Sequence, residues 1–155
     1  MEKFSNHRGD YWNQIKTELL DLNGSEKFRF QYLEMGQLFS HGYSVAQTEL
    51  NPSQLIFKIW NADYDNNRFD KGVFNLDRLA IRDSKVELNP QELKMINRLL
   101  DSELSLIDWG GITLDGLFCQ FETDKKKFDW NTNNEINSNL TELVELIRNK
   151  AATNK

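Results

Sequence analysis

The segment Ile112–Thr123, with the sequence ITLDGLFCQFET, is the strongest indication of the fold in this chain. Its Asp115-Gly116 pair suits a two-residue hairpin turn, because both residues adopt positive φ readily. With Leu114 opposite Leu117, the apolar side chains of both strands fall on one face of the hairpin. These side chains are Ile112, Leu114, Leu117, Cys119 and Phe121. We therefore predict a β-hairpin whose apolar face packs on a core.

Alternating apolar and polar residues predict further strands on both sides of this segment. Lys27–Leu33 (KFRFQYL) has a period of two, and Gln54–Trp60 (QLIFKIW) carries bulky side chains on both sides, which indicates a central strand. Between them, glycines interrupt a weaker apolar stretch. Gly72–Leu88 is typical of one or two strands, with a break near Asp83. Lys125–Trp130 (KKKFDW) adds a strand whose lysines protect it from edge pairing.

Three segments have the three-four spacing of amphipathic helices. The first covers residues 11–22 behind Asp10 as cap, the second begins at Asn89-Pro90, and the third covers residues 138–151. The elements do not alternate as parallel βαβ units do. We predict an α+β fold, an antiparallel β-sheet with about three helices packed on one face or end. Residues 1–155 form a single domain, with about 1–9 and 151–155 flexible.

The composition limits the classes of function. The chain has 155 residues, a net charge of −5 and a pI near 5.1, which argues against a nucleic-acid partner, since phosphate binding needs surplus Lys and Arg. The single cysteine, Cys119, allows no internal disulfide and lies on the apolar face of the predicted hairpin, so we expect a core residue. No membrane-spanning run or signal sequence is recognisable, and we expect a cytoplasmic protein.

The polar segment Asn61–Gly72 (NADYDNNRFDKG) resembles part of a calcium loop. Asp63, Asp65 and Asn67 match the first three ligand positions of an EF-hand loop. Arg68 replaces the required glycine and Phe74 replaces the closing glutamate. We therefore expect no metal here, and interpret the segment as a solvated loop between two strands or as an acidic recognition surface.

The recognition hypothesis assigns contact residues for a protein partner. In the polar segment these are Asp63, Tyr64, Asp65 and Asp70, with Tyr64 or Trp60 as an aromatic anchor. Asp108 and Trp109 form a second expected patch, because Trp109 lies in the polar-flanked turn IDWGG before the hairpin and is the tryptophan expected to be partly exposed.

Catalytic and cofactor signatures are missing from the sequence. One cysteine and two histidines, His7 and His41, do not make a zinc motif, and no phosphate-binding glycine pattern occurs. We expect no catalytic residues, no cofactor and no metal.

The carboxyl-terminal third resembles bacterial toxin-immunity proteins. The resemblance lies in Ile112–Phe118, in Lys127–Trp130 (KFDW) and in the amphipathic helix that ends the chain. It implies a small acidic α+β protein without enzymatic activity, which binds a cognate toxin domain and blocks its active site. A toxin that attacks nucleic acid has a basic site, to which an acidic inhibitor is attracted.

Two other functions remain open from the sequence. One is a small-ligand-binding or hydrolytic domain with an aromatic-lined pocket on the sheet, closed by the last helix. The other is a phage-borne inhibitor of a host defence nuclease, which would act by the same electrostatic attraction.

Overall fold

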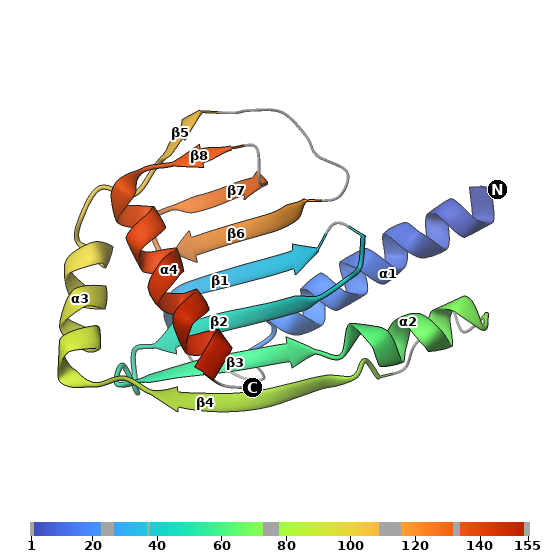
Figure 1. Cartoon of the computed structure of the whole chain (residues 1–155), viewed down its shortest axis with the longest axis horizontal. Coiled ribbons are helices and arrows are strands. Elements are labelled where there is room, and N and C mark those ends of the chain that lie inside the picture. The colour runs from blue at the N-terminus through green and yellow to red at the C-terminus, as the bar shows by residue number, and fades with distance from the viewer. Residues whose placement is uncertain are drawn as a thin grey trace.

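Six antiparallel strands form the main sheet. The computed structural model describes residues 2–22, 27–36, 38–72, 78–108, 116–131 and 134–153. The six strands are β1 (Phe28–Gly36), β2 (Gly42–Thr48), β3 (Gln54–Trp60), β4 (Ile81–Glu87), β6 (Leu117–Thr123) and β7 (Lys127–Asn131). Their order is β4-β3-β2-β1-β6-β7 (Figure 1). Two short strands, β5 (Leu106–Asp108) and β8 (Glu135–Ile136), pair with each other.

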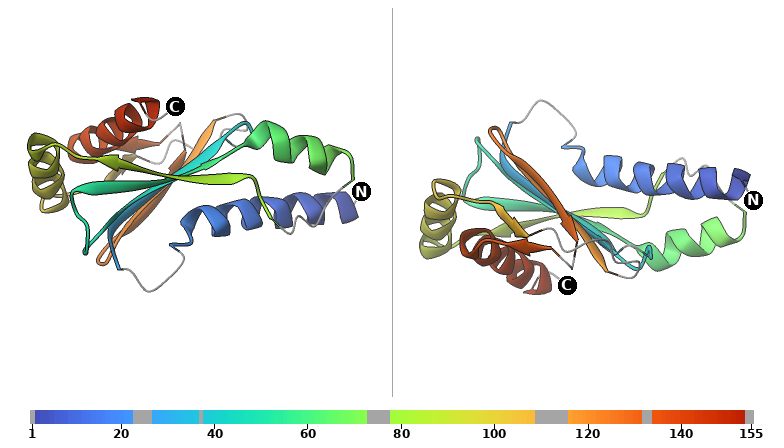
Figure 2. Two further views of the ribbon diagram at one scale, coloured as in Figure 1. Left: turned by 90° about the horizontal axis from the view of Figure 1, so that it is seen from below. Right: turned by 90° about the horizontal axis from the view of Figure 1, so that it is seen from above.

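Helices cover both faces and both ends of this sheet. The described residues form α1 (Glu2–Leu20), α2 (Ala62–Asp70), α3 (Pro90–Leu100) and α4 (Ser138–Thr153). Figure 2 shows α1 and α4 on opposite faces, while α2 and α3 lie at opposite ends of the strands. The predicted α+β class with an antiparallel sheet is confirmed, and the structure adds α2 to the three helices predicted. None of the described helices combines the length and apolar character needed to cross a membrane.

The core under α4 is aromatic and branched aliphatic. Phe30, Tyr32, Phe57 and Phe121 point from the strands toward this face, and all four are fully buried. Leu140, Leu143, Val144 and Ile147 of α4 fill the same cluster, as their helical spacing predicts. Cys119 is buried there too, as expected for a core cysteine.

The opposite face is built for close approach of α1. The β2 positions facing this helix are small, namely Gly42, Ser44 and Ala46. A Cβ on Gly42 would lie 3.3 Å from a Leu19 methyl carbon, which leaves little room for a larger residue. The Ser44 hydroxyl donates a hydrogen bond to the Leu19 carbonyl oxygen. Small residues also weaken the apolar alternation, which is why β2 was indistinct in the sequence.

Strand β6 of the predicted hairpin pairs with two other strands of the main sheet. β6 pairs with β1 along one edge, from Leu117 opposite Gly36 to Thr123 opposite Phe30. It pairs with β7 along the other edge, from Phe118 opposite Asn131 to Glu122 opposite Lys127, so these residues of β6 have β1 and β7 as neighbours on both edges. The predicted pairing of Leu117 with Leu114 stays a prediction, because Leu114 lies outside the described residues. Leu117, Cys119 and Phe121 do share one face, as predicted. The remaining part of the predicted hairpin, residues 112–115, lies outside the described residues.

Other boundaries differ from the sequence predictions. Helix α1 begins at Glu2, so Asp10 lies inside the helix instead of capping it, and residues 2–9 are helical. Strand β4 runs without a break through Asp83. Helix α3 begins at Pro90, as predicted, and the structure adds a reciprocal cap: the Asn89 side chain accepts a hydrogen bond from the Glu92 amide (2.8 Å), and the Glu92 carboxylate accepts one from the Asn89 amide (2.9 Å).

Truncation of Leu19 should loosen α1 from the sheet. Leu19 is fully buried, so Leu19→Ala removes apolar contacts and leaves a cavity above Gly42. We expect a loss of about 2 to 5 kcal/mol in the free energy of unfolding, measured by urea denaturation. Thr17→Ala on the exposed side of the same helix is the matched control, and an equal loss in both variants would contradict this packing.

Candidate functional site

The segment predicted as a polar loop is a helix. Residues 62–70 form α2, and the Asn61 side chain accepts a hydrogen bond from the Tyr64 amide at its start (3.2 Å). Asp63 and Asp65 lie in the first turn, where the helix dipole favours negative charge. The alternate spacing of Asp63, Asp65 and Asn67 therefore does not form a calcium loop, because side chains two positions apart in a helix point in different directions.

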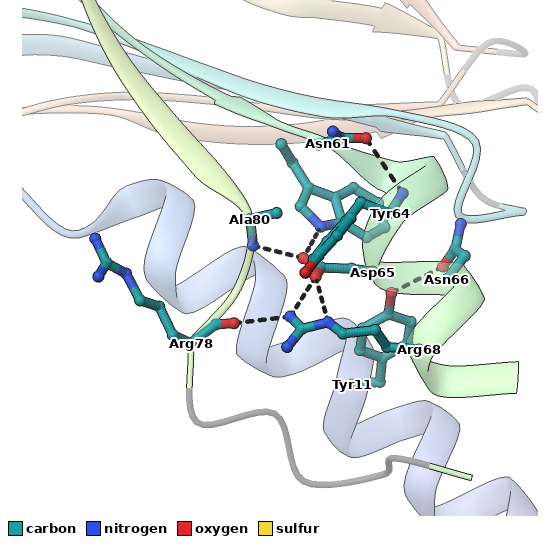
Figure 3. Close-up of polar contacts among 9 residues, drawn as sticks. Tyr11, Asn61, Tyr64, Asp65, Asn66, Arg68, Arg78 and Ala80 are labelled. Carbon is teal, nitrogen blue, oxygen red and sulfur yellow. Dashed lines mark hydrogen bonds and ion pairs between the residues drawn. The ribbon is translucent and has the colours of Figure 1, made fainter. Parts of the chain in front are cut away.

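Asp65 is the centre of a buried polar cluster. Its side chain is fully buried, and Oδ2 accepts hydrogen bonds from Trp60 Nε1 (2.8 Å) and from the Ala80 amide (2.7 Å). Arg68 forms an ion pair with Oδ1 one turn along α2 (Figure 3). The carboxylate thus joins α2 to Trp60 at the end of β3 and to Ala80, the residue before β4. It does not belong to an exposed acidic patch, which corrects the prediction for Asp65.

Arg68 extends this cluster toward the surface. Its Nη2 donates a second hydrogen bond to the Arg78 carbonyl oxygen (2.8 Å). The hydrogen bond to Asp65 raises the pKa of Arg68 above its ordinary value, so the guanidinium is charged throughout the accessible pH range. The Tyr64 ring lies 5.2 Å from the guanidinium carbon, a cation–π distance.

The exposed side of α2 has two stripes with different chemistry. Asp63, Asn67 and Asp70 follow the i, i+4, i+7 spacing and are all exposed, so they form an acidic stripe. Tyr64 and Arg68, spaced i, i+4, form the adjacent stripe. The Tyr64 side chain is among the large hydrophobic groups that stay exposed, at 57%. Two of the three acids predicted in this segment therefore share a surface with the predicted aromatic anchor.

Helix α1 holds α2 from the other side. The Tyr11 hydroxyl donates a hydrogen bond to Asn66 Oδ1 (2.8 Å), and Asn66 Nδ2 donates one to the Phe39 carbonyl oxygen (2.7 Å). The Tyr11 ring also stacks on Phe69, with 4.4 Å between ring centres. Both buried sides of α2 are thus held by hydrogen bonds and ring stacking, and its two exposed stripes face away from these contacts.

A cleft of about 710 Å³ opens between α2 and the start of β4. Its walls include Trp60, Tyr64, Leu79 and Ile81, and three arginines stand around it. The arginines are Arg68, Arg78 and Arg82. Sequence reasoning missed this feature because Arg78 and Arg82 are distant from α2 in the chain, and only the pairing of β4 with β3 brings them there.

The second predicted patch is only partly described. Asp108 lies in β5, where it pairs with Glu135 of β8. Trp109 lies outside the described residues, so this patch stays a prediction.

A second cluster of ionisable groups surrounds Glu34 on the α4 face. Glu34 Oε1 accepts hydrogen bonds from the Tyr32 hydroxyl (2.7 Å), from Arg148 Nε (2.9 Å) and, more weakly, from the Tyr43 hydroxyl (3.4 Å). His41 Nε2 lies 3.7 Å from Oε2, an ion-pair distance when the ring is protonated. The cluster therefore joins β1, β2 and α4, beside an open groove of about 360 Å³.

The protonation states of this cluster suit a structural role. Burial alone would raise the pKa of Glu34, but His41, Tyr32 and Arg148 together outweigh it and lower the pKa to about 2. Burial raises the pKa of Cys119 to about 11 and raises the pKa of both Tyr32 and Tyr43. At neutral pH Glu34 is an ionised carboxylate that already accepts several hydrogen bonds, Cys119 is a thiol, and Tyr32 and Tyr43 are neutral phenols. None of these four groups is an activated nucleophile or a carboxylate of raised pKa.

The described ranges contain no group of three or more His, Cys, Asp or Glu side chains placed to hold a metal ion. In the segment that resembles a calcium loop, Asp65 is occupied by protein donors, while Asp63 faces solvent. The two carboxylates therefore do not converge on one ion.

Both buried carboxylates left a signal in the sequence. Glu34 follows Phe30 and Tyr32 at the alternate positions of a strand, and Asp65 shares the helical spacing of Ala62 and Phe69. An acid in phase with an apolar face predicts a buried, paired carboxylate. Which residues pair with it depends on the tertiary structure.

Removing the charge of Asp65 should destabilise the fold. In Asp65→Asn the amide oxygen can face Trp60 and Ala80 only if the NH2 group is turned toward Arg68, so one set of donors is left opposite another donor, and Arg68 loses its ion pair in either orientation. We expect a loss of roughly 2 to 4 kcal/mol in unfolding free energy, by urea denaturation. Asp63→Asn, on the exposed stripe of the same helix, should change stability by less than about 0.5 kcal/mol. Equal stability of the two variants would refute the Asp65 cluster.

Glu34 should make the protein sensitive to acid. Its folded pKa of about 2 lies below the ordinary value of 4.5, so its contribution is complete above pH 4.5 and is lost as the pH falls toward 2. The difference corresponds to roughly 3 kcal/mol. Glu34→Gln should be less stable than wild type at pH 7, and should lose less stability than wild type between pH 4.5 and 2. The exposed Glu103→Gln should retain the wild-type dependence, and an unchanged profile in Glu34→Gln would contradict this assignment.

Comparison with protein-family models, with curated proteins and with solved structures finds no match to this chain.

Proposed function

We propose that this chain is a non-enzymatic protein that binds another protein through the exposed side of α2. The partner is a toxin domain with a basic active site, which the chain neutralises in the cytoplasm as an immunity protein. The surface consists of Tyr64 as the aromatic anchor and of Asp63 and Asp70 as its charged neighbours. No nucleic acid and no membrane takes part.

The observation that carries the proposal is an exposed tyrosine on a rigid helix. Tyr64 is 57% exposed, although α2 is fastened by Asp65 to the sheet and by Tyr11 to α1. Tyrosine contributes much contact area with few rotatable bonds, and a fixed backbone reduces the entropy lost on binding. A buried carboxylate is a costly way to hold a helix, which favours a surface whose geometry matters.

The charge of the molecule supports a basic partner. The chain has a net charge of −5, and Asp63 and Asp70 lie on the exposed stripe of α2 next to Tyr64. An acidic surface accelerates encounter with a basic active site and repels polyanions such as nucleic acids. The class of the partner comes from the resemblance of the carboxyl-terminal third to toxin-immunity proteins. In that third, strand β7 comes before helix α4, which is the predicted order. The α2 surface lies outside that third, so the two arguments are independent.

Capture of the partner and charge reversal test this proposal. A tagged chain is purified from its native host, and proteins retained by wild type but lost in Tyr64→Ala are identified by mass spectrometry. With the retained protein, we expect Asp63→Lys plus Asp70→Lys to weaken binding at least tenfold and to flatten its dependence on salt.

The matched control is Asp124→Lys, an exposed acid in the turn between β6 and β7, which should bind within twofold of wild type. Co-expression with the retained protein then tests neutralisation, since wild type should restore growth and Tyr64→Ala should not. Equal binding by wild type, Tyr64→Ala and the double reversal would refute the α2 surface. Capture of a partner that is not toxic would refute the immunity role.

A further inference from the structure

We propose that the outer edge of β4 binds a second copy of this chain, whose own β4 pairs antiparallel with it about a two-fold axis at Ser84. The two main sheets then join into one continuous sheet. The inference does not depend on the proposed function, because it uses only β4 and the hydrogen bonds of β4 to β3.

The outer edge of β4 is open in the part of the chain that the structure describes. β4 is the last strand in the order of the main sheet, and its one neighbour there is β3 (Figure 1). The side chains of Asp83, Lys85 and Glu87 are exposed along this strand. Ile81–Glu87 contains no proline, and its pairing with β3 has no shift in register. A regular strand with a free edge is a template on which another strand can pair.

The hydrogen bonds at the two ends of β4 establish which residues face outward. The Ala80 carbonyl accepts a hydrogen bond from the Asn61 amide (2.7 Å), and the Leu88 amide donates one to the Ser53 carbonyl (2.8 Å). Directly opposite residues of an antiparallel pair exchange hydrogen bonds only at every second position, so the even-numbered residues of β4 bond to β3. The odd-numbered residues therefore direct their N–H and C=O groups toward the open edge, namely Asp83, Lys85 and Glu87.

This alternation permits few registers between two copies. An outward-facing residue must lie opposite another outward-facing residue, so the allowed registers differ by steps of two. A register centred on Asp83 places two carboxylates opposite each other, and one centred on Lys85 places two ammonium groups opposite each other; both are unfavourable. A register centred on Ser84 places Asp83 of each copy opposite Lys85 of the other. The charges of β4 therefore favour the register about Ser84.

The side chains that meet in this register share one face of the sheet. Ser84 lies opposite Phe57, which belongs to the core under α4, so Asp83 and Lys85 lie on the face of α1. In a hydrogen-bonded antiparallel pair the Cα atoms are about 5.5 Å apart, a separation across which these side chains can form an ion pair. Each such pair also exchanges both backbone hydrogen bonds. A second copy thus supplies partners for the backbone groups and for the charges of the edge together.

The helices are placed so that this pairing joins the strands side by side. α1 and α4 lie on the faces of the sheet, and α2 and α3 lie at the ends of its strands (Figure 2). The two-fold axis brings the start of one β4 to the end of the other, so the two α2 helices lie at opposite ends of the joined strands. A contact through one pair of strands is small beside the roughly 1,600 Å² of a typical stable interface, so we expect a reversible dimer.

Sedimentation velocity of the full chain, from low micromolar to near-millimolar concentration, tests the pairing. We expect wild type to dimerise reversibly and Lys85→Glu to dimerise at least tenfold more weakly, because Asp83 would then face a carboxylate. Asp83→Lys plus Lys85→Glu exchanges the two charges, keeps the net charge, and should recover most of the lost affinity. Lys125→Glu makes the same change of charge in the turn between β6 and β7, and should dimerise within twofold of wild type.

Two outcomes of this experiment would overturn the inference. If wild type stays monomeric throughout, the edge of β4 is left to a strand of another protein. If wild type and Lys85→Glu dimerise equally, the copies meet through another surface. Urea denaturation checks that each variant is folded.

A cysteine cross-link tests the register without changing a charge, because Asp83→Lys also acts within one copy, where Asp83 lies opposite Lys58 of β3. In the proposed register Ser84→Cys places two thiols opposite each other, with about 4.5 Å between the Cα atoms, which permits a disulfide. We expect oxidised glutathione to convert this variant to a covalent dimer that dithiothreitol separates. Val86→Cys, which would lie opposite Arg82 of the second copy, should cross-link at least tenfold less. Equal cross-linking of the two variants, or none in Ser84→Cys, would refute the pairing about Ser84.

Discussion

The buried carboxylate of Asp65 is the interaction on which the position of helix α2, and with it the proposed binding surface, depends. It accepts hydrogen bonds from Trp60 at the end of β3, from Arg68 of α2 and from the amide of Ala80, which is 15 residues away in the chain. A buried carboxylate requires such partners, because an unpaired charge in the protein interior costs far more free energy than an unpaired polar group without charge. Because Asp65 must keep these partners, helix α2 can occupy few positions. The position of α2 in turn determines where Tyr64 and Arg68 lie.

The other face of the sheet uses the same device. Glu34 of β1 is buried beneath α4 and is paired with Arg148 of that helix, whereas Asp65 lies in α2 itself and is hydrogen-bonded to Trp60 of β3 and to the Ala80 amide. A further ion pair, Lys150 with Glu92 (2.7 Å), joins α4 to α3. Apolar packing fills both faces of the sheet, but apolar contacts tolerate sliding, whereas a buried ion pair has a defined geometry. These pairs therefore specify the positions of the helices more than they add to stability.

The surface that results carries both signs of charge within one helix and its neighbouring strand. Acids at i, i+4, i+7 spacing face solvent beside an aromatic residue, and arginines surround the adjoining cleft. The net charge of −5 alone would predict a uniformly acidic surface. The local arrangement is more varied: among the described residues, arginines line the cleft and acids occupy the neighbouring stripe of α2.

The sequence by itself determined the class of fold, most strands, the start of α3 and the inward stripe of α4, because these follow from local periodicity and from the preference of proline for the first position of a helix. It also placed Asp63 and Tyr64 at a surface. Only the tertiary structure decided that residues 62–70 are helical, since the ordering of this polar segment depends on Trp60, Tyr11 and the Ala80 amide, which no local pattern reveals. It likewise decided the neighbours of β6, because a strand with an apolar face can pair at either edge. The arginine cleft belongs wholly to this second group: its residues come from separate segments, and long-range strand pairing alone brings them together.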